Sequence, residues 1–277
     1  MDPLEALASR AFCRVADAQQ SDGNRVKLLR DGPQTFAAWL AAIDNAKHSV
    51  DLENYIIQED AIGQQFADAL IAATARGVTC RVLYDWLGCL TRTSKHFWAR
   101  LAAGGVKIRR YNAPHIENPL RWVSRDHRKV LCVDGAVAFT GGLCIGHDWV
   151  GDPAAGIPPW RDTAIEITGP AVAHVAAAFE DSWEAAGART PTGKDIPPIA
   201  GTETHEGVEV SVIAGRPESM GLYRPDLFKR MKLMQDVDAI LADAAPMIAA
   251  HGLDLEEARN VVLSELLGEQ PLPMGRA

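Results

Sequence analysis

The sequence lacks an excess of positive charge. It holds 28 Lys and Arg residues against 36 Asp and Glu residues, which gives a formal net charge of −8 at pH 7. Proteins that bind nucleic acids through the phosphate backbone usually carry a basic excess, because lysine and arginine neutralise the phosphates. The charge balance therefore argues against a general nucleic-acid-binding protein, and nucleic acid is not the expected partner.

Long apolar runs are also missing. No run approaches the roughly 18 apolar residues that a membrane-spanning helix needs. The first residues, MDPLEALASRAF, carry acidic side chains where a signal peptide has a basic flank. We therefore expect neither a membrane-spanning helix nor export, and we expect a cytoplasmic location.

Cysteines are few, and their number is odd. Their spacing matches neither a disulfide framework nor a zinc signature. We expect each of them to be a small buried hydrophobic residue in a reducing compartment, namely Cys13, Cys80, Cys89, Cys132 and Cys144. No cluster of His, Asp and Cys has the spacing of metal ligands, so we expect no metal and no other cofactor.

The apolar fraction of 47% is typical of globular proteins, and its pattern begins with a βαβ unit. Thr35 has the chemistry of a helix N-cap, and residues 49–57 alternate like a strand. Asp60 is placed to cap a second helix, which should end at Gly77, and residues 78–84 form the next strand. Short joints between these elements predict parallel strands with a right-handed crossover.

The pattern then changes from parallel to antiparallel. Asp134–Gly135 joins two short apolar runs, and this dipeptide is typical of a β-hairpin turn. The expected elements are a helix over 96–103, strands over 106–111, 129–133, 136–140 and 163–168, and a helix from Val172 to Trp183. The predicted fold class is α/β (α+β), a mixed β-sheet flanked by helices.

Composition divides the chain into three parts. Residues 1–187 form the predicted catalytic lobe, and residues 188–206, rich in Pro, Thr and Gly, form a linker. Residues 207–277 begin with a strand over 208–213 and continue as a helical tail. The tail is acidic, since residues 231–277 hold three basic and eight acidic side chains. We interpret residues 207–277 as an incomplete second lobe.

One stretch, RDHRKVLCVDGAVAFTGGLC (125–144), carries residues suited to chemistry at phosphorus. His127 and Lys129 lie two apart in a strand, so they project from the same face. A neutral histidine can attack phosphorus while a lysine holds the phosphate oxygens. Gly141 and Gly142 let backbone approach an anionic group closely, because they have no Cβ. Residues 107–129 also hold seven basic and two acidic side chains.

The order His127-x-Lys129, Asp134 and Gly141–Gly142 resembles the HKD signature of the phospholipase D superfamily. SVDLENYIIQEDAIGQQFADALIAATARGVTCRVLYDWLG is similar to the first lobe of bacterial cardiolipin synthase-like members, and WRDTAIEITGPAV to the segment after the motif. The resemblance covers roughly residues 30–187 and implies a phospholipase D-like lobe that acts without a metal.

The resemblance also implies roles for single residues. His127 matches the catalytic histidine, which forms a phosphohistidine or protonates the leaving alcohol, and Lys129 matches the phosphate-binding lysine. Asp134 matches the motif aspartate, whose part is mainly structural, and Asp162 matches a carboxylate that orients the histidine. Cys144 stands where the family usually has an asparagine that hydrogen-bonds to the phosphate, and a thiol is a poor substitute donor.

A larger departure is that no second His-x-Lys occurs in the chain. The family reaction divides its work between two histidines, a nucleophile and a general acid. One motif per chain therefore requires a homodimer through that face, or else the lobe is inactive. The leading hypothesis is a phospholipase D-type phosphodiesterase or phosphatidyltransferase acting on a phospholipid, with peripheral membrane contact. The alternatives are an inactive truncated lobe and a single-motif nuclease acting as a dimer.

Two carboxylates near strand ends leave two interpretations open. Glu53 and Asp85 can line a ligand pocket, because strand ends in such sheets face ligands. They can equally be structural carboxylates whose hydrogen bonds are satisfied inside the fold.

Overall fold

A computed structural model of the chain describes residues 13, 18–111, 125–152, 155–187 and 207–214. The chain divides into two compact units, Ser21–Val210 and Met1–Gln20 with Ser211–Ala277. Almost all described residues belong to the first unit. The expected linker and most of the expected tail lie outside the described residues, so the division into a lobe, a linker and an incomplete second lobe stays a prediction.

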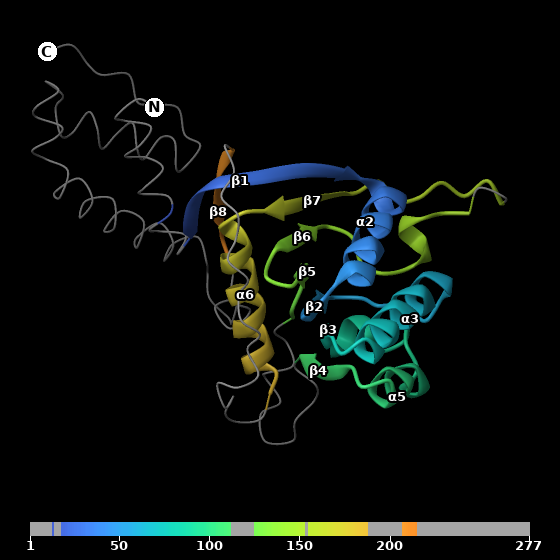
Figure 1. Cartoon of the computed structure of the whole chain (residues 1–277). Coiled ribbons are helices and arrows are strands. Elements are labelled where there is room, and N and C mark those ends of the chain that lie inside the picture. The colour runs from blue at the N-terminus through green and yellow to red at the C-terminus, as the bar shows by residue number, and fades with distance from the viewer. Residues whose placement is uncertain (1–12, 14–17, 112–124, 153–154, 188–206, 215–277) are drawn as a thin grey trace, which may run out of the picture. The chain divides into compact units, whose positions relative to one another are not determined.

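A mixed sheet of eight strands organises the described residues, as expected (Figure 1). The strand order is β4-β3-β2-β5-β6-β7-β1-β8, where β2, β3 and β4 are parallel and the pairs from β2–β5 to β7–β1 are antiparallel. The strands are β1 Gln19–Arg30, β2 Ser49–Asn54, β3 Thr79–Asp85, β4 Lys107–Tyr111, β5 Lys129–Val133, β6 Val137–Gly141, β7 Thr163–Thr168 and β8 Val208–Val212.

Helices cover both faces of this sheet. α2, α3 and α5 lie on one face and α6 lies on the other (Figure 1). None of the described helices is both long and apolar enough to cross a bilayer. The helices are α2 Asp31–Asn45, α3 Ala61–Ala75, α4 Trp86–Cys89, α5 Lys95–Ala103 and α6 Ala171–Ala185, with a 3₁₀ turn, η2, at His147–Trp149.

The two faces of the sheet are packed differently. On the side of α2 and α3, aromatic rings of Phe36, Trp39, Phe66 and Phe139 meet within a large apolar core. All six residues of β2 are buried because this strand has helices on both faces.

The side of the sheet that faces α6 contains buried charges. Arg81 of β3 donates to Asp51 of β2 at 2.6 Å and to Glu180 of α6 at 2.7 Å. Its side chain is 3% exposed, so the two carboxylates replace the water that would otherwise solvate the guanidinium.

The start of the first helix differs from the expectation. Thr35 is buried inside α2 rather than at its N-cap, since α2 begins at Asp31. The sequence gives no sign of β1, which pairs with β7 and leads directly into the helix. The backbone N–H of Arg30 donates to the Gln34 side chain, a contact that resembles one half of a capping box.

Other local predictions are confirmed. Asp60 accepts hydrogen bonds from the backbone N–H groups of Ile62 and Gly63 and so caps α3. Gly77 follows that helix with φ +91°, in the left-handed region where glycine is favoured. β2 ends at Asn54 rather than at Ile57, because its antiparallel partner β5 begins at Lys129, opposite Asn54.

Candidate active site

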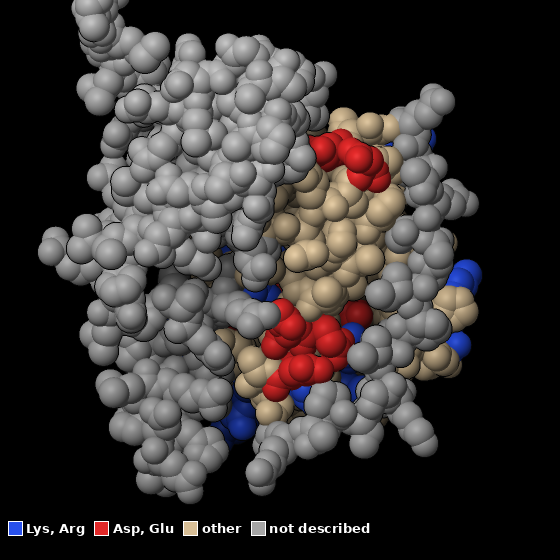
Figure 2. Space-filling view, turned by 90° about the vertical axis from the view of Figure 1, so that its left-hand side faces the viewer, with Lys and Arg blue, Asp and Glu red and all other residues tan. Residues whose placement is uncertain are grey.

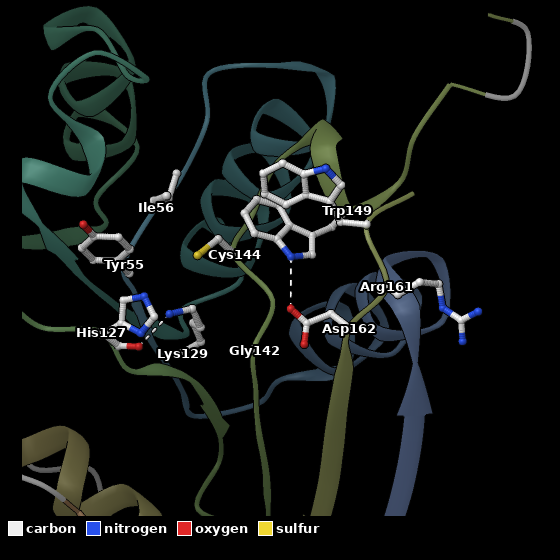
Figure 3. A pocket seen from close by; sticks show the side chains of 10 residues that line it. Tyr55, Ile56, His127, Lys129, Gly142, Cys144, Trp149, Arg161 and Asp162 are labelled. Atoms are coloured by element: carbon white, nitrogen blue, oxygen red, sulfur yellow. Dashed lines mark hydrogen bonds between the residues drawn. The ribbon is translucent and has the colours of Figure 1, made fainter. Parts of the chain in front are cut away.

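One pocket, of about 510 Å³, gathers most of the residues that the signature singles out. His127 and Lys129 reach it from the start of β5, Gly142 and Cys144 from the segment after β6, and Asp162 from just before β7 (Figure 3). Its lining residues are Tyr55, Ile56, His127, Lys129, Gly142, Cys144, Trp149, Trp160, Arg161 and Asp162. The strand order β2-β5-β6-β7 brings these segments together.

His127 lies two residues before the start of β5, not inside the strand as expected, and its side chain is exposed in the single chain. Its imidazole forms no hydrogen bond with any side chain or backbone group of the described ranges, and its ring packs against Tyr55, with centroids 4.7 Å apart. Partial burial lowers the pKa of His127 below its ordinary 6.5, and the positive charge of Lys129 lowers it further. The imidazole is therefore neutral at neutral pH, which is the form that can attack phosphorus.

Lys129 is the first residue of β5 and is 5% exposed. Its Nζ donates a hydrogen bond to the backbone carbonyl of His127 at 2.7 Å and lies 5.4 Å from the centroid of the Tyr55 ring. Burial lowers the pKa of Lys129, whereas Cys144, Asp126 and Asp162 oppose that change. The ammonium group therefore sits at the pocket as a positive point charge.

Asp162 lines the same pocket but does not contact His127. Its Oδ2 accepts a hydrogen bond from the indole N–H of Trp149 at 3.3 Å, and its Oδ1 accepts one from the backbone N–H of Thr163 at 2.7 Å. Among the described residues, no hydrogen bond joins Asp162 to His127. The role of histidine-orienting carboxylate is therefore not fulfilled within one chain in this structure.

The two glycines of the signature lie where neighbouring residues of the same chain leave no space for a Cβ. A Cβ at Gly142 would collide with the carboxylate of Asp162, and a Cβ at Gly141 would collide with Thr163 and Ala164 of β7. Gly142 lines the pocket, whereas Gly141 ends β6 against the neighbouring strand. The absence of a Cβ at Gly142 thus leaves space for the Asp162 carboxylate at the pocket. A direct contact of either glycine with an anionic ligand stays a prediction.

Cys144 is buried but borders the pocket. Burial raises the pKa of its thiol, and Lys129 opposes that rise. The group is therefore a neutral thiol, a weak donor that borders the same pocket as Lys129. All five cysteines are buried, as expected.

Asp134 lies at the opposite end of β5 from Lys129 and does not line the pocket. It adopts φ +56° in the hairpin turn. Its carboxylate accepts hydrogen bonds from the backbone N–H groups of Lys47, His48 and Ser49, at 2.7 to 2.8 Å. Its contacts are thus those of a structural residue that joins the hairpin to the start of β2.

Sequence reasoning missed several pocket residues. Tyr55 comes from the segment after β2, and Trp160 and Arg161 precede Asp162 in the chain. Trp160 is 58% exposed and meets the Trp149 ring edge-on at 5.1 Å. The adjacency of Trp160 and Arg161 to a candidate carboxylate was an available signal, whereas no local pattern connects Tyr55 with His127.

Glu53 and Asp85 do not line the pocket, since both are fully buried. Asp85 fits the structural interpretation, because it caps α4 and also accepts hydrogen bonds from Arg125 and from the backbone of Asp126. Glu53 fits neither interpretation, because its oxygens have no hydrogen-bond donor among the described residues.

Comparison with known proteins gives the family of this domain. Residues 39–149 match the sequence family described as cardiolipin synthase, PLD-like domain. Cardiolipin synthase 1 of Bacillus cereus is 37% identical over 164 residues, which are 59% of this chain and 32% of that protein. The cardiolipin synthase of Halalkalibacterium halodurans is 32% identical over 231 residues, 82% of this chain and 45% of that protein.

Among solved structures, a phospholipase D family member, Nuc from Salmonella typhimurium, matches with a TM-score of 0.45 at 20% identity. The match covers 59% of this chain and 97% of that one. The chain spans less than half the length of the two cardiolipin synthases. The sequence resemblance is confirmed: the chain carries a phospholipase D-like domain of the phospholipase D superfamily, with homologues among the cardiolipin synthases.

Proposed function

We propose that the chain is a phospholipase D-type phosphodiesterase or phosphatidyltransferase that acts on a phospholipid such as phosphatidylglycerol. The single observation that carries this proposal is the meeting of a neutral imidazole and an ammonium group, His127 and Lys129, at one pocket. Kinship with cardiolipin synthases supports the phospholipid class, and the aromatic lining by Tyr55, Trp149 and Trp160 suits an amphiphilic substrate.

The reaction proceeds in two displacements. A ring nitrogen of His127 attacks phosphorus, a P–N bond forms, and the P–O bond to the leaving alcohol breaks. An imidazolium group protonates the leaving oxygen, while Lys129 stabilises the charge that develops on the phosphate oxygens. Water or a second alcohol then attacks phosphorus and gives its proton to the imidazole that protonated the leaving oxygen. The P–N bond to His127 breaks, and both histidines return to their starting forms.

A second copy of the chain supplies the second imidazole in this proposal. One histidine cannot be nucleophile and acid in the same step, and the sequence has a single His-x-Lys. The exposed His127 ring and the pocket beside it leave room for a facing copy. In a two-fold dimer, each pocket contributes the same residues to a joint centre.

The dimer also gives Asp162 a proposed role. Within one chain this carboxylate is held by Trp149 and Thr163 and does not reach His127. We propose that it orients His127 of the second copy instead. Contact with the inner face of a membrane would then bring lipid to the joint centre.

The first test is turnover of phosphatidylglycerol in vesicles, with lipid products as the readout. Wild-type protein should turn over and His127→Ala should lose activity by at least about 10³-fold, because the nucleophile is gone. His48→Ala, at an exposed histidine next to the Asp134 turn, is the matched control and should keep full activity. No turnover by folded wild-type protein would contradict the proposal for this substrate.

Mixed dimers test the shared centre. If one centre uses His127 from both copies, an equal mixture of wild-type and His127→Ala chains should retain about one quarter of the activity after subunit exchange. Independent centres would retain about one half. The second result would reject the two-copy mechanism while leaving the enzyme itself intact.

Two other functions are each favoured by a specific observation, namely an inactive lobe and a dimeric nuclease. An inactive lobe fits the single motif and the loss of the usual asparagine at Cys144. A dimeric nuclease is supported by the basic stretch that begins in β4, but the net charge of −8 opposes it. The side of the domain that carries α6 also presents a gathering of acidic groups (Figure 2). A nuclease would bind DNA with a steep salt dependence, and a lipid enzyme would not.

A further inference from the structure

The strand pattern does not orient the His127 ring. β5 begins at Lys129, so the alternation of side chains along a strand directs Lys129 but not His127, which lies two residues earlier. The imidazole is exposed and forms no hydrogen bond with any group of the described residues. Exposed side chains without such a bond change rotamer rapidly. A histidine that attacks phosphorus in one orientation therefore needs another constraint.

The backbone on both sides of His127 is already fixed. The backbone N–H of Asp126 donates to the Asp85 carboxylate at 3.0 Å, and the Asp126 carboxylate accepts a hydrogen bond from the backbone N–H of Arg128 at 3.2 Å. The guanidinium of Arg128 in turn donates to the carbonyl of Ala178 in α6 at 2.7 Å. These contacts determine where the backbone of His127 lies, but they do not determine the torsion angles of its side chain.

The ring of Tyr55 packs directly against the His127 imidazole. The two ring centroids lie 4.7 Å apart, and the ring planes meet at 53°. Aromatic rings at this separation favour tilted contacts over face-to-face stacking. The contact limits the rotamers that the imidazole can adopt, because several of them would place it in the space that Tyr55 fills.

The same ring also contacts the lysine of the motif. Lys129 Nζ lies 5.4 Å from the centroid of the Tyr55 ring, which is within the range of a cation–π contact. The ammonium group also donates to the His127 carbonyl at 2.7 Å. One aromatic ring therefore touches both the candidate nucleophile and the candidate phosphate-binding group, beside the pocket that all three line (Figure 3).

Tyr55 itself is held in place by two neighbouring segments. The backbone N–H of Ile145, after β6, donates to the carbonyl of Ile56 at 3.1 Å. On α4, the thiol of Cys89 donates to the Tyr55 carbonyl at 3.7 Å. A Cβ at Gly88 would lie 2.1 Å from that carbonyl oxygen and 3.1 Å from Cε2 of the ring, so α4 approaches both the backbone and the ring of Tyr55.

We propose that Tyr55 is a positioning residue: its ring holds the His127 imidazole and the Lys129 ammonium group in fixed orientations at the pocket. Both contacts are made by the ring, so the hydroxyl group is not required. Tyr55 also packs against the apolar core, and a role confined to packing would change stability without changing the order of the His127 ring. The catalytic meaning of this inference rests on the proposed function, but the order of the ring does not.

The first test measures that order by NMR relaxation of the full chain with ¹³C-labelled histidine, assigned with His127→Ala. Tyr55→Leu removes the aromatic ring and should lower the order parameter of the His127 side chain by at least about a third, because its rotamers then interconvert. Tyr55→Phe keeps the ring and should retain the wild-type value. Unchanged order in folded Tyr55→Leu would overturn the proposal.

Trp98→Leu is the matched control. The Trp98 ring is half-buried, stacks on Tyr84 with centroids 3.8 Å apart, and does not line the pocket. Its loss removes an aromatic contact elsewhere in the domain and should leave the His127 ring as ordered as in the wild type. An equal loss of order in Trp98→Leu and Tyr55→Leu would reflect a general loosening of the fold and would also overturn the proposal.

A measurement on the wild type covers the case in which Tyr55→Leu fails to fold. Nuclear Overhauser effects should join the Tyr55 ring protons to those of the His127 ring and to the side chain of Lys129, since these groups are in contact. Absence of the contact between Tyr55 and His127 would overturn the proposal without any variant.

Turnover of phosphatidylglycerol vesicles separates this inference from the proposed function. Tyr55→Leu should lose about 10- to 100-fold in kcat while KM stays within a few-fold, because a misoriented nucleophile slows the chemical step. Tyr55→Phe should stay within a few-fold of the wild type. A wild type without turnover would contradict the proposed function but leave the NMR result standing. Loss of ring order with unchanged kcat would reject the role of Tyr55 in the reaction.

Discussion

The ammonium group of Lys129 donates a hydrogen bond to the backbone carbonyl of His127, 2.7 Å away. The candidate phosphate-binding group and the candidate nucleophile are thus joined before any substrate arrives. A phosphate in the pocket would compete with this carbonyl for the ammonium protons.

The charge of Lys129 should control the titration of His127. Burial lowers the pKa of His127 and Lys129 lowers it further, so Lys129→Met should raise that pKa towards 6.5. Histidine NMR titration of the full chain measures this directly. Lys129→Arg keeps the positive charge and should leave the pKa low, whereas a pKa that is equally low in Lys129→Met would contradict the prediction.

Removal of the Asp134 side chain should affect stability rather than chemistry. Asp134→Ala loses three hydrogen bonds from backbone N–H groups and keeps a positive φ, so we expect a loss of about 2 to 4 kcal/mol in the free energy of unfolding. Asp134→Asn keeps one acceptor and tolerates that φ, so it should lose less. Denaturant unfolding measures both, and equal losses in the two variants would contradict this account.

Replacing Arg81 alone should strongly destabilise the fold, because its two carboxylate partners stay buried. Arg81→Met leaves Asp51 and Glu180 without their partner, and we expect a loss of about 3 to 5 kcal/mol in the free energy of unfolding. The triple variant Asp51→Asn, Arg81→Met, Glu180→Gln should recover much of that loss, because no buried charge is left unpaired. A triple variant no more stable than Arg81→Met would refute this explanation.

Cys144 should limit the proposed turnover. Cys144→Asn restores a hydrogen-bond donor beside Lys129, and a contribution of about 1 to 3 kcal/mol to the transition state corresponds to a gain of roughly 5- to 150-fold in kcat. Cys144→Ala is the control and should leave kcat within a few-fold of the wild type. An asparagine variant no faster than the alanine variant would show that the thiol position does not contact the phosphate.

Local patterns predicted the local elements well. Asp60 caps the start of α3 and Gly77 follows its end, and Asp134–Gly135 forms the turn of the β5–β6 hairpin. These elements were predictable because caps and tight turns depend on a few neighbouring residues. β1 escaped notice because it lacks clear alternation: most of its side chains are exposed, and its pairing with β7 is a distant contact.

The sequence by itself determined the family and singled out the pair His127-x-Lys129, although the strand expected to carry both residues begins only at Lys129. Only the tertiary structure decided which other groups meet that pair. The order β2-β5-β6-β7 puts Tyr55 and Asp162 at the same pocket, places Asp134 at the far end of β5, and leaves Glu53 fully buried within the sheet. Spacing along the chain does not encode strand order, because contacts between distant segments arise only when all layers pack together.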